Sequence, residues 1–276
     1  MSYKNRNNIT NRIGGQGAGS KAGQSIYDES SIAKFSLGEK LEFADGRVFR
    51  YGYTGAAIKA GLLVSPDVSA QSTAELSNAA PAAIFPWSPA AGSSKLQISG
   101  TSGVVKDQYA GGYLQINNAL DDGVGEGIQY RIKTHSATAA TTAGRIDVEL
   151  YDPLKVTLDG DGSPTSDIYI QGSPYNQLIT ASTADSLVMG VSPIAFTANY
   201  YGWFQTAGIA LVLMEAVGST VPNIGDTLTL GDGVAGACQQ AIGSTNVDPI
   251  IGIQVTNKSN PEAGDFIGVQ LRLGEV

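Results

Sequence analysis

Apolar and polar residues alternate with a period of two in many short segments of the chain. The alternation is strictest in Ile128-Gln-Tyr-Arg-Ile132 and Ile146-Asp-Val-Glu-Leu150. This period predicts antiparallel β-strands with one buried face, because successive side chains of a strand point to opposite sides. Clusters of Gly, Asp, Asn and Pro separate the segments and predict turns. The predicted strands are 113–117, 127–134, 145–151, 154–158, 167–171 and 187–191, followed by 201–206, 209–214, 226–230, 235–241, 250–256 and 266–273.

The segment 40–51 predicts a β-hairpin. Apolar residues alternate with charged ones on both sides of Asp45-Gly46, a dipeptide that permits positive φ in a two-residue turn. Another strand is expected at 61–64. It is followed by Ser65-Pro66-Asp67, which has the residue types of a helix N-cap and first turn, so we predict a short helix near 66–79.

Together these elements predict a mainly β protein. We expect small antiparallel β-barrel or β-sandwich modules, a flexible N-terminal arm and one short helix. The expected domains are an extended arm at 1–34, a β-rich domain at 35–198 and a compact C-terminal β module at 199–276. A chain of 276 residues is long enough to bury such cores.

The N-terminal arm differs in composition from the rest of the chain. Asn, Gly, Ser and Gln dominate its sequence, and four of the 17 basic residues but none of the 25 acidic ones precede Asp28. Because it contains few large apolar side chains, we expect it to be disordered in isolation and to order against a partner; a frayed terminus is the alternative. The candidate partner-binding residues of the arm are Lys4, Arg6, Ile9, Arg12, Ile13 and Lys21.

Composition and charge argue against several classes of protein. A single cysteine, Cys238, excludes an intramolecular disulfide and a cysteine-rich zinc site, and a single histidine, His135, makes acid–base or metal chemistry less favoured. The formal net charge of −8 argues against nucleic-acid binding. No segment has the length and hydropathy of a membrane helix, and no secretory signal is expected, so we predict assembly in a cytoplasm.

Four motifs resemble ligand-binding sequences, and each has a simpler interpretation. Gly231-Asp-Gly-Val-Ala-Gly236 matches a dinucleotide-binding string, but the residues after it are too few for the helix that the motif needs, so a hairpin turn is favoured. Gly14–Lys21 lacks the residue order and the preceding strand of a phosphate loop. Asp159-Gly-Asp-Gly162 and the acidic cluster at 121–126 lack the further ligands of a calcium loop and favour turns.

The sequence gives equally little indication of a catalytic site. Cys238 and His135 are far apart in the sequence, and no neighbouring residue is placed to orient either, so a buried core cysteine and a strand-end histidine are the default interpretations. A carboxylate pair of a glycosidase stays possible among 25 acids, without a pattern that indicates one. The aromatic run Tyr200–Phe204 is suited to stacking on a sugar, but aromatic residues in strands are more often core. We expect no catalytic residue, no metal and no cofactor.

Two stretches of the sequence carry a resemblance to a known family. The first is Leu37-Gly-Glu-Lys-Leu-Glu-Phe-Ala-Asp-Gly-Arg-Val-Phe-Arg-Tyr51, followed by Gly61-Leu-Leu-Val64. The second comprises Tyr201-Gly-Trp-Phe-Gln-Thr206, Gly208, Val212, Gly225-Asp226, Gly236, Pro249-Ile-Ile-Gly252 and Val269-Gln-Leu-Arg-Leu273. Both stretches resemble capsid decoration (cement) proteins of tailed bacteriophages. The middle, roughly 65–195, is unmatched and is longer than simple cement proteins have, which raises the prospect of an added β domain with an outward-facing role.

The resemblance implies a non-enzymatic structural protein on the outer capsid surface of a virion. The implied partners are the major capsid protein of the expanded lattice and further copies of this chain, commonly as a homotrimer, with no nucleic acid and no membrane. The charged fraction of 15% fits an uncharged, assembly-forming surface. The expected docking residues of the body are Arg47, Phe49, Tyr51, Tyr201, Trp203 and Gln205. The alternatives are a tail or fibre-type receptor-binding protein that recognises host glycans and a polysaccharide-degrading β enzyme.

Overall fold

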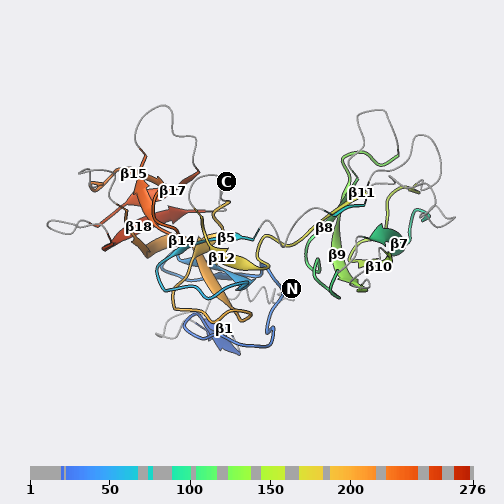
Figure 1. Cartoon of the computed structure of the whole chain (residues 1–276), viewed down its shortest axis with the longest axis horizontal. Coiled ribbons are helices and arrows are strands. Elements are labelled where there is room, and N and C mark those ends of the chain that lie inside the picture. The colour runs from blue at the N-terminus through green and yellow to red at the C-terminus, as the bar shows by residue number, and fades with distance from the viewer. Residues whose placement is uncertain are drawn as a thin grey trace, which may run out of the picture. The chain divides into compact units, whose positions relative to one another are not determined.

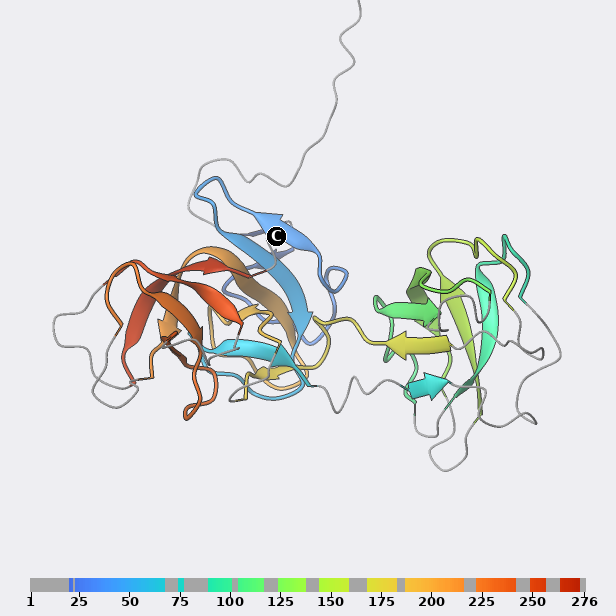
Figure 2. The ribbon, with the colours of Figure 1, turned by 90° about the horizontal axis from the view of Figure 1, so that it is seen from above.

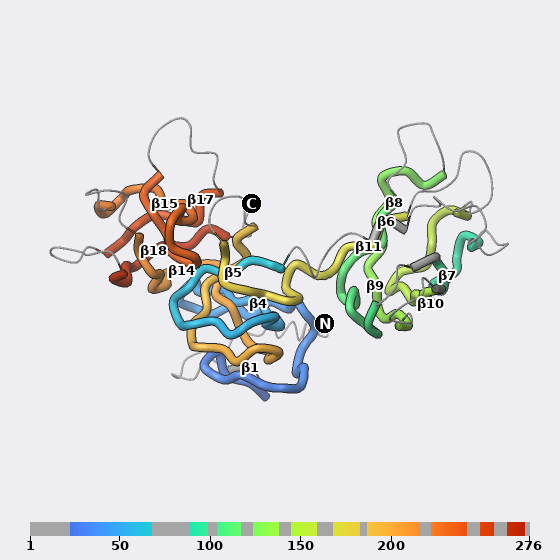
Figure 3. Tube along the Cα trace, viewed as in Figure 1, coloured from blue at the N-terminus to red at the C-terminus, as the bar shows by residue number. Residues whose placement is uncertain are grey.

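The chain forms two compact units in the computed structural model (Figure 1). The structure describes residues 20–21, 23–67, 74–76, 89–100, 104–116, 124–137, 144–158, 168–182, 187–215, 222–241, 249–256 and 264–273. Unit 1 contains residues 1–67 and 174–276, and unit 2 contains residues 68–173. This division differs from the expected sequential domains 1–34, 35–198 and 199–276, because both ends of the chain, blue and orange to red in Figure 3, build one unit.

Unit 2 is a six-stranded antiparallel sheet (green to yellow in Figure 2). Its strands follow the order β6-β11-β8-β9-β10-β7, and the two end strands, β6 and β7, also lie close to each other, so the sheet is curled. The strands are β6 (Ala74–Leu76), β7 (Lys95–Gly100), β8 (Tyr113–Ile116), β9 (Gln129–His135), β10 (Gly144–Leu150) and β11 (Ile168–Gln171).

The core of unit 2 follows from the alternation in its sequence. In β10, Ile146 and Val148 are buried and Asp147 between them is exposed. In β9, Ile132 is buried and its neighbours Arg131 and Lys133 are exposed. Leu154 and Leu158 also join this core, although 154–158 forms no strand, contrary to the prediction. Apolar residues at this spacing can therefore be buried beside a sheet without joining its hydrogen-bond ladder.

Unit 1 contains a ten-stranded antiparallel sheet and a two-stranded hairpin of β1 and β2. The order in the large sheet is β12-β5-β13-β14-β18-β17-β15-β16, and β4 pairs with both β14 and β3. The strands are β1 (Ser20–Lys21), β2 (Gln24–Ser25), β3 (Lys40–Glu42), β4 (Val48–Tyr53), β5 (Leu63–Pro66), β12 (Leu178–Thr180), β13 (Gly190–Val191), β14 (Tyr201–Leu213), β15 (Thr227–Leu230), β16 (Cys238–Gln240), β17 (Ile250–Gln254) and β18 (Phe266–Arg272).

Strand β14 is the longest strand and pairs with β4, β13 and β18. The sequence predicts two strands here, 201–206 and 209–214, and the structure contains one continuous strand with a β-bulge between Gln205 and Ala207. The side-chain amide of Gln205 donates to the carbonyls of Ala207 and Ile209, both at 3.0 Å, and Gly208 has φ +81°. These contacts stabilise the irregular segment of β14, after which β14 pairs with β18 instead of β4.

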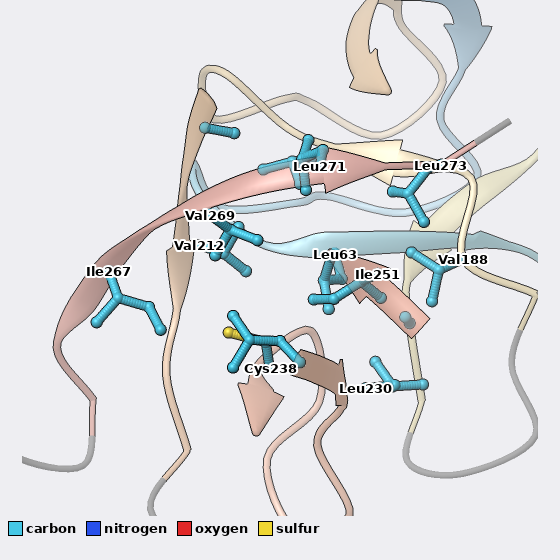
Figure 4. Packing of buried hydrophobic residues seen from close by; sticks show 14 of the residues in the cluster. Leu63, Val188, Val212, Leu230, Cys238, Ile251, Ile267, Val269, Leu271 and Leu273 are labelled. Atoms are coloured by element: carbon cyan, nitrogen blue, oxygen red, sulfur yellow. The ribbon is translucent and has the colours of Figure 1, made fainter. Parts of the chain in front are cut away.

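Three clusters of apolar side chains form the core of unit 1. Figure 4 shows the largest of them, where side chains from β5, β14, β17 and β18 converge and the sulfur of Cys238 lies among them. A second cluster contains the stacked rings of Phe196 and Phe204, whose centroids are 4.7 Å apart. The third cluster is aromatic and lies between β4, β14 and the N-terminal segment. Each cluster depends on β14, which contributes residues to all three.

The hairpin expected at 40–51 is present as β3 and β4, with a different turn. The amide of Gly46 donates to the carbonyl of Phe43 (3.1 Å) and the amide of Phe43 to the carbonyl of Arg47 (2.9 Å), and in Asp45-Gly46 only the glycine has positive φ, at +84°. The connection is therefore a longer turn that ends in a left-handed glycine, not the predicted two-residue turn.

A helix does not span residues 66–79. Pro66 is the last residue of β5, and Ala74–Leu76 form β6. No helix occurs in the part of the chain that the structure describes. The helix prediction relied on an N-cap signal, and the pairing of Pro66 with Leu178 on β12 overrides that local preference.

Substitution of Gly202 by alanine is expected to destabilise unit 1 by about 1–3 kcal/mol, since the new methyl group would overlap the Phe196 ring, within 2.6 Å of its Cζ. Urea unfolding measures the change in the free energy of unfolding. In a Phe196→Leu background the same substitution should cost less, because the ring edge is gone. Equal costs in the two backgrounds would contradict this account of the packing.

Candidate docking surface

The structure brings together the docking residues that we expected on β4 and β14, but in the core. Trp203 lies opposite Tyr51 and Gln205 opposite Phe49 in the β4–β14 pair. Phe49, Tyr51, Trp203 and Gln205 are buried, and the Tyr51 and Trp203 rings meet edge to face, with 5.0 Å between centroids. These four side chains stabilise unit 1 and do not form a contact surface.

The other two expected docking residues are partly accessible. Tyr201 packs its ring against Tyr53, with 4.6 Å between centroids. Arg47 lies in the β3–β4 turn, where its Nε is 2.7 Å from Oδ2 of Asp45 and its guanidinium lies over the Phe43 ring, 5.1 Å from the centroid. Although burial raises the pKa of the Asp45 carboxyl, hydrogen bonds and charge from Arg47 outweigh it and leave the pKa below its ordinary value. Arg47 is therefore held in a fixed position at the tip of the hairpin.

The aromatic cluster of unit 1 holds the segment that follows β2. The Tyr51 hydroxyl donates to Oε1 of Gln24 (2.8 Å) and accepts from the amide of Lys34 (3.1 Å). Burial raises the pKa of that hydroxyl, which therefore keeps the proton it donates. Ser30 and Tyr201 exchange two backbone hydrogen bonds of 3.0 and 2.8 Å.

The N-terminal arm therefore ends before residue 34, the boundary expected from the sequence. Residues 23–34 pack on unit 1, so the arm does not extend as a separate element to residue 34. Five of the six expected arm residues, and the side chain of the sixth, lie outside the described residues: Lys4, Arg6, Ile9, Arg12 and Ile13, with Lys21 described in its backbone alone.

An exposed apolar surface lies on the outer face of β14 and β18. We call it the outer face; it consists of Ile209, Leu211, Leu213 and Phe266. Ile209, Leu211 and Phe266 are 57%, 63% and 48% exposed, and Leu213 is half-buried because it packs against the cluster that contains Phe196 and Phe204. Leu213 lies directly opposite Phe266, which also packs beside Gly61. The alternate residues of β14, Ala210, Val212 and Met214, are buried in the core.

The outer face was not predicted from the sequence, although the sequence contains a signal for it. Residues 209–214 are apolar at every position, so both faces of this strand are apolar. Strands of this kind are usually covered on both faces, whereas a strand with one solvated face alternates. An apolar outer face that remains exposed in the single chain is typical of a surface that binds another molecule.

The dinucleotide-like string is a turn, as expected. It connects β15 to β16, which pair directly. The carboxylate of Glu215 accepts hydrogen bonds from the amides of Gly233 and Val234, both at 3.0 Å, so a side chain of the same chain occupies the position that a phosphate would take. The strings at 14–21 and 159–162 and the acids of the cluster at 121–122 lie outside the residues whose side chains are described.

Neither the cysteine nor the histidine is arranged for catalysis. Cys238 is buried in unit 1, and burial raises the pKa of its thiol to about 12. His135 is buried in unit 2, where its Nε2 accepts from the amide of Tyr109 (2.9 Å) and its Nδ1 donates to the carbonyl of Ser136 (2.7 Å). Both ring nitrogens are therefore engaged within the protein.

The electrostatic environment of His135 favours the neutral ring. Burial lowers the pKa of His135 below its ordinary value, against the opposing effects of the Ser136 hydrogen bond and the Asp107 charge. The carboxylate of Asp107, a residue with φ +62°, accepts hydrogen bonds from the amide of His135 (3.0 Å) and the hydroxyl of Thr134. This network fixes the end of β9.

Comparisons with protein-family models, curated proteins and solved structures find no match for this chain. Within the described residues, no three His, Cys, Asp or Glu side chains are grouped in a metal-binding arrangement. The same residues contain no helix with the length and hydropathy to cross a membrane. The outer face is therefore identified as a candidate docking surface by its exposure and its apolar side chains.

We expect unit 2 to lose stability as the pH falls below the ordinary imidazole pKa of about 6.5, because the unfolded chain then binds a proton that buried His135 resists. Calorimetry at pH 7 and about pH 5.5 should show a smaller drop in Tm for His135→Gln than for the wild type. The comparison stays above the range where carboxyl groups titrate. Equal drops in both proteins would rule out His135 as the cause.

Proposed function

We propose that the protein is a capsid decoration (cement) protein, a non-enzymatic component of a tailed-bacteriophage virion. In this proposal it binds the outer surface of the expanded major capsid protein lattice and stabilises the head. Its partners are the major capsid protein and further copies of itself in a homotrimer, assembled in the host cytoplasm. The two sheets would act as small barrel or sandwich modules, unit 1 as the docking body and unit 2 as an outward-facing addition.

The observation that carries the proposal is the exposed outer face of unit 1. Leu211 and its neighbours present apolar side chains that lose contact with water when another protein covers them, which contributes about 25 cal/mol per Å² of apolar surface. A modest gain per copy is enough on a lattice, because a symmetric oligomer makes several such contacts at once. Association of this kind needs neither an active site nor a cofactor.

The position of the phage-like stretches supports the same proposal. Both stretches contribute strands to unit 1, and the unmatched middle contains unit 2. Their aromatic residues form the core, so the resemblance concerns the architecture of the docking body. The residues that contact a capsid would then be those on its surface, with the outer face as the first candidate.

The N-terminal arm supplies a second contact in this proposal. Its basic residues Lys4, Arg6, Arg12 and Lys21 complement an acidic partner surface, and Ile9 and Ile13 provide apolar anchors. Removal of residues 1–19 should weaken capsid binding and leave unit 1 folded, since Gln24 and the residues after it keep their contacts with Tyr51. Undiminished binding of the shortened chain would exclude a role for residues 1–19.

The proposal is tested by co-sedimentation of the purified chain with expanded, undecorated capsids of its parent phage. Saturation at a fixed number of lattice sites, with hundreds of copies per particle and a raised melting temperature of the capsid, is the expected result. About a dozen copies would indicate a tail component instead. Absence of binding by chain that is folded by circular dichroism would overturn the proposal.

Leu211→Ser is expected to weaken capsid binding about tenfold per site, because an exposed leucine loses roughly 1–2 kcal/mol of transfer free energy when serine replaces it. Leu187→Ser is the matched control, since Leu187 is 59% exposed and also belongs to unit 1. The same co-sedimentation assay measures both variants. A similar loss for both variants, or none for Leu211→Ser, would show that the outer face does not dock.

A further inference from the structure

A groove lies on unit 2, which contains none of the residues assigned to docking. Its cavity volume is about 560 Å³, within the range of small-molecule sites in proteins. Strands β7, β9 and β10 form it together with the turn that contains Lys106. The lining residues are Lys95, Leu96, Gln97, Lys106, Thr134, His135, Ser136, Asp147, Val148 and Glu149.

A β-bulge on β9 shapes this groove. Glu149 on β10 lies opposite Thr134, and the next residue, Leu150, lies opposite Ile132, so Lys133 is the extra residue. The bulge changes the alternation of β9, which turns His135 into the core and leaves both Lys133 and Thr134 beside Glu149. Bulges are frequent next to functional sites, where they redirect side chains.

The polar side chains form two rows across the three strands. In the first row, Lys95 and Thr134 lie on either side of Glu149. In the second, Gln97 lies opposite Asp147, whose backbone amide donates to the hydroxyl of Ser136 at 2.9 Å. The two rows occupy the solvent-facing side of the sheet.

The rows are held in place by their own hydrogen bonds. Nε2 of Gln97 donates to Oδ1 of Asp147 (2.6 Å), and Nζ of Lys133 donates to Oε1 of Glu149 (2.6 Å). These bonds use one of the two amide hydrogens of Gln97 and part of the acceptor capacity of each carboxylate, which is about four positions. The side-chain oxygen of Gln97 also accepts from Nη1 of Arg145 (3.2 Å), so the positions left for a ligand are the second amide hydrogen of Gln97 and the remaining acceptor positions of the two carboxylates.

The chemistry of the groove selects a neutral, hydroxyl-rich ligand. Two lysines and two carboxylates line it, so neither an anion nor a cation is favoured by net charge. Planar amide and carboxylate groups can each bind adjacent hydroxyl groups, which donate and accept at once. Beyond Glu149 along the same face, Tyr151 is 52% exposed, and the guanidinium of Arg131 lies over its ring, 5.2 Å from the centroid. A sugar would stack on the opposite side of this ring.

We propose that this groove is a carbohydrate-binding site that recognises a neutral sugar through Gln97, Asp147 and Glu149. Both nitrogens of His135, which also lines the groove, are engaged within the protein. The proposed site lies on unit 2, whereas the outer face belongs to unit 1, so substitutions can test sugar binding and capsid binding one at a time. A decorated capsid would carry this site on every copy.

The test uses the full chain labelled with ¹⁵N, titrated with glucose, galactose, mannose and N-acetylglucosamine up to about 20 mM, since single sugars often bind in the millimolar range. Inorganic phosphate is the anionic comparison. Saturable shifts of the amides in 95–97, 134–136 and 147–149 by at least one sugar, with none by phosphate, are the expected result. Shifts by phosphate alone, or by none of these compounds together with no signal on a neutral-glycan array, would overturn the proposal.

Substitutions in the groove test whether the sugar binds there. Gln97→Ala and Asp147→Ala should each weaken sugar binding at least tenfold, and Asp147→Asn serves where the alanine variant does not fold. Gln115→Ala is the matched control, because Gln115 also lies on a strand of unit 2 and donates to Gln129 and Gln171 (3.1 and 3.2 Å) but does not line the groove. Equal binding by the groove variants and the control would place the sugar elsewhere.

Discussion

The pairing of β14 with three partner strands is the interaction on which unit 1 depends. One strand contributes to all three apolar clusters and passes from β4 to β18 through a bulge that the side chain of Gln205 stabilises. Its first half brings Trp203 against Tyr51, and its second half carries Leu211 on the solvent side. Strand β14 therefore contributes both to the internal stability of the unit and to its exposed apolar surface.

The sequence predicted strands well where their two faces differ in polarity. Ile146–Leu150 and Ile128–Ile132 alternate strictly, and both segments belong to strands that bury one face. The prediction failed at Leu154 and Leu158, whose burial needs no backbone pairing. It also gave two strands in place of β14, because a bulge bridged by a side-chain amide does not appear as a periodic pattern in the sequence.

The candidate docking surface was harder to predict from the sequence than the fold. Conspicuous aromatic residues such as Trp203 indicated a surface, yet large apolar rings gain most from burial and form the core. The burial of His135 depends on a bulge at Lys133, and a shift of one residue reverses which side chains face solvent. Strand order, and with it the grouping of Gln97 with Asp147, depends on contacts between distant segments that a local pattern does not encode.

The way in which unit 2 is inserted has a consequence for how such a protein can change. The chain leaves unit 1 after β5 and returns at β12, and these two strands are neighbours, with Pro66 directly opposite Leu178 and the amide of Asp67 donating to the carbonyl of Gln177 at 2.9 Å. A short hairpin turn would close this gap. Because β5 and β12 pair directly, a different domain inserted between them would leave the strand order of unit 1 unchanged.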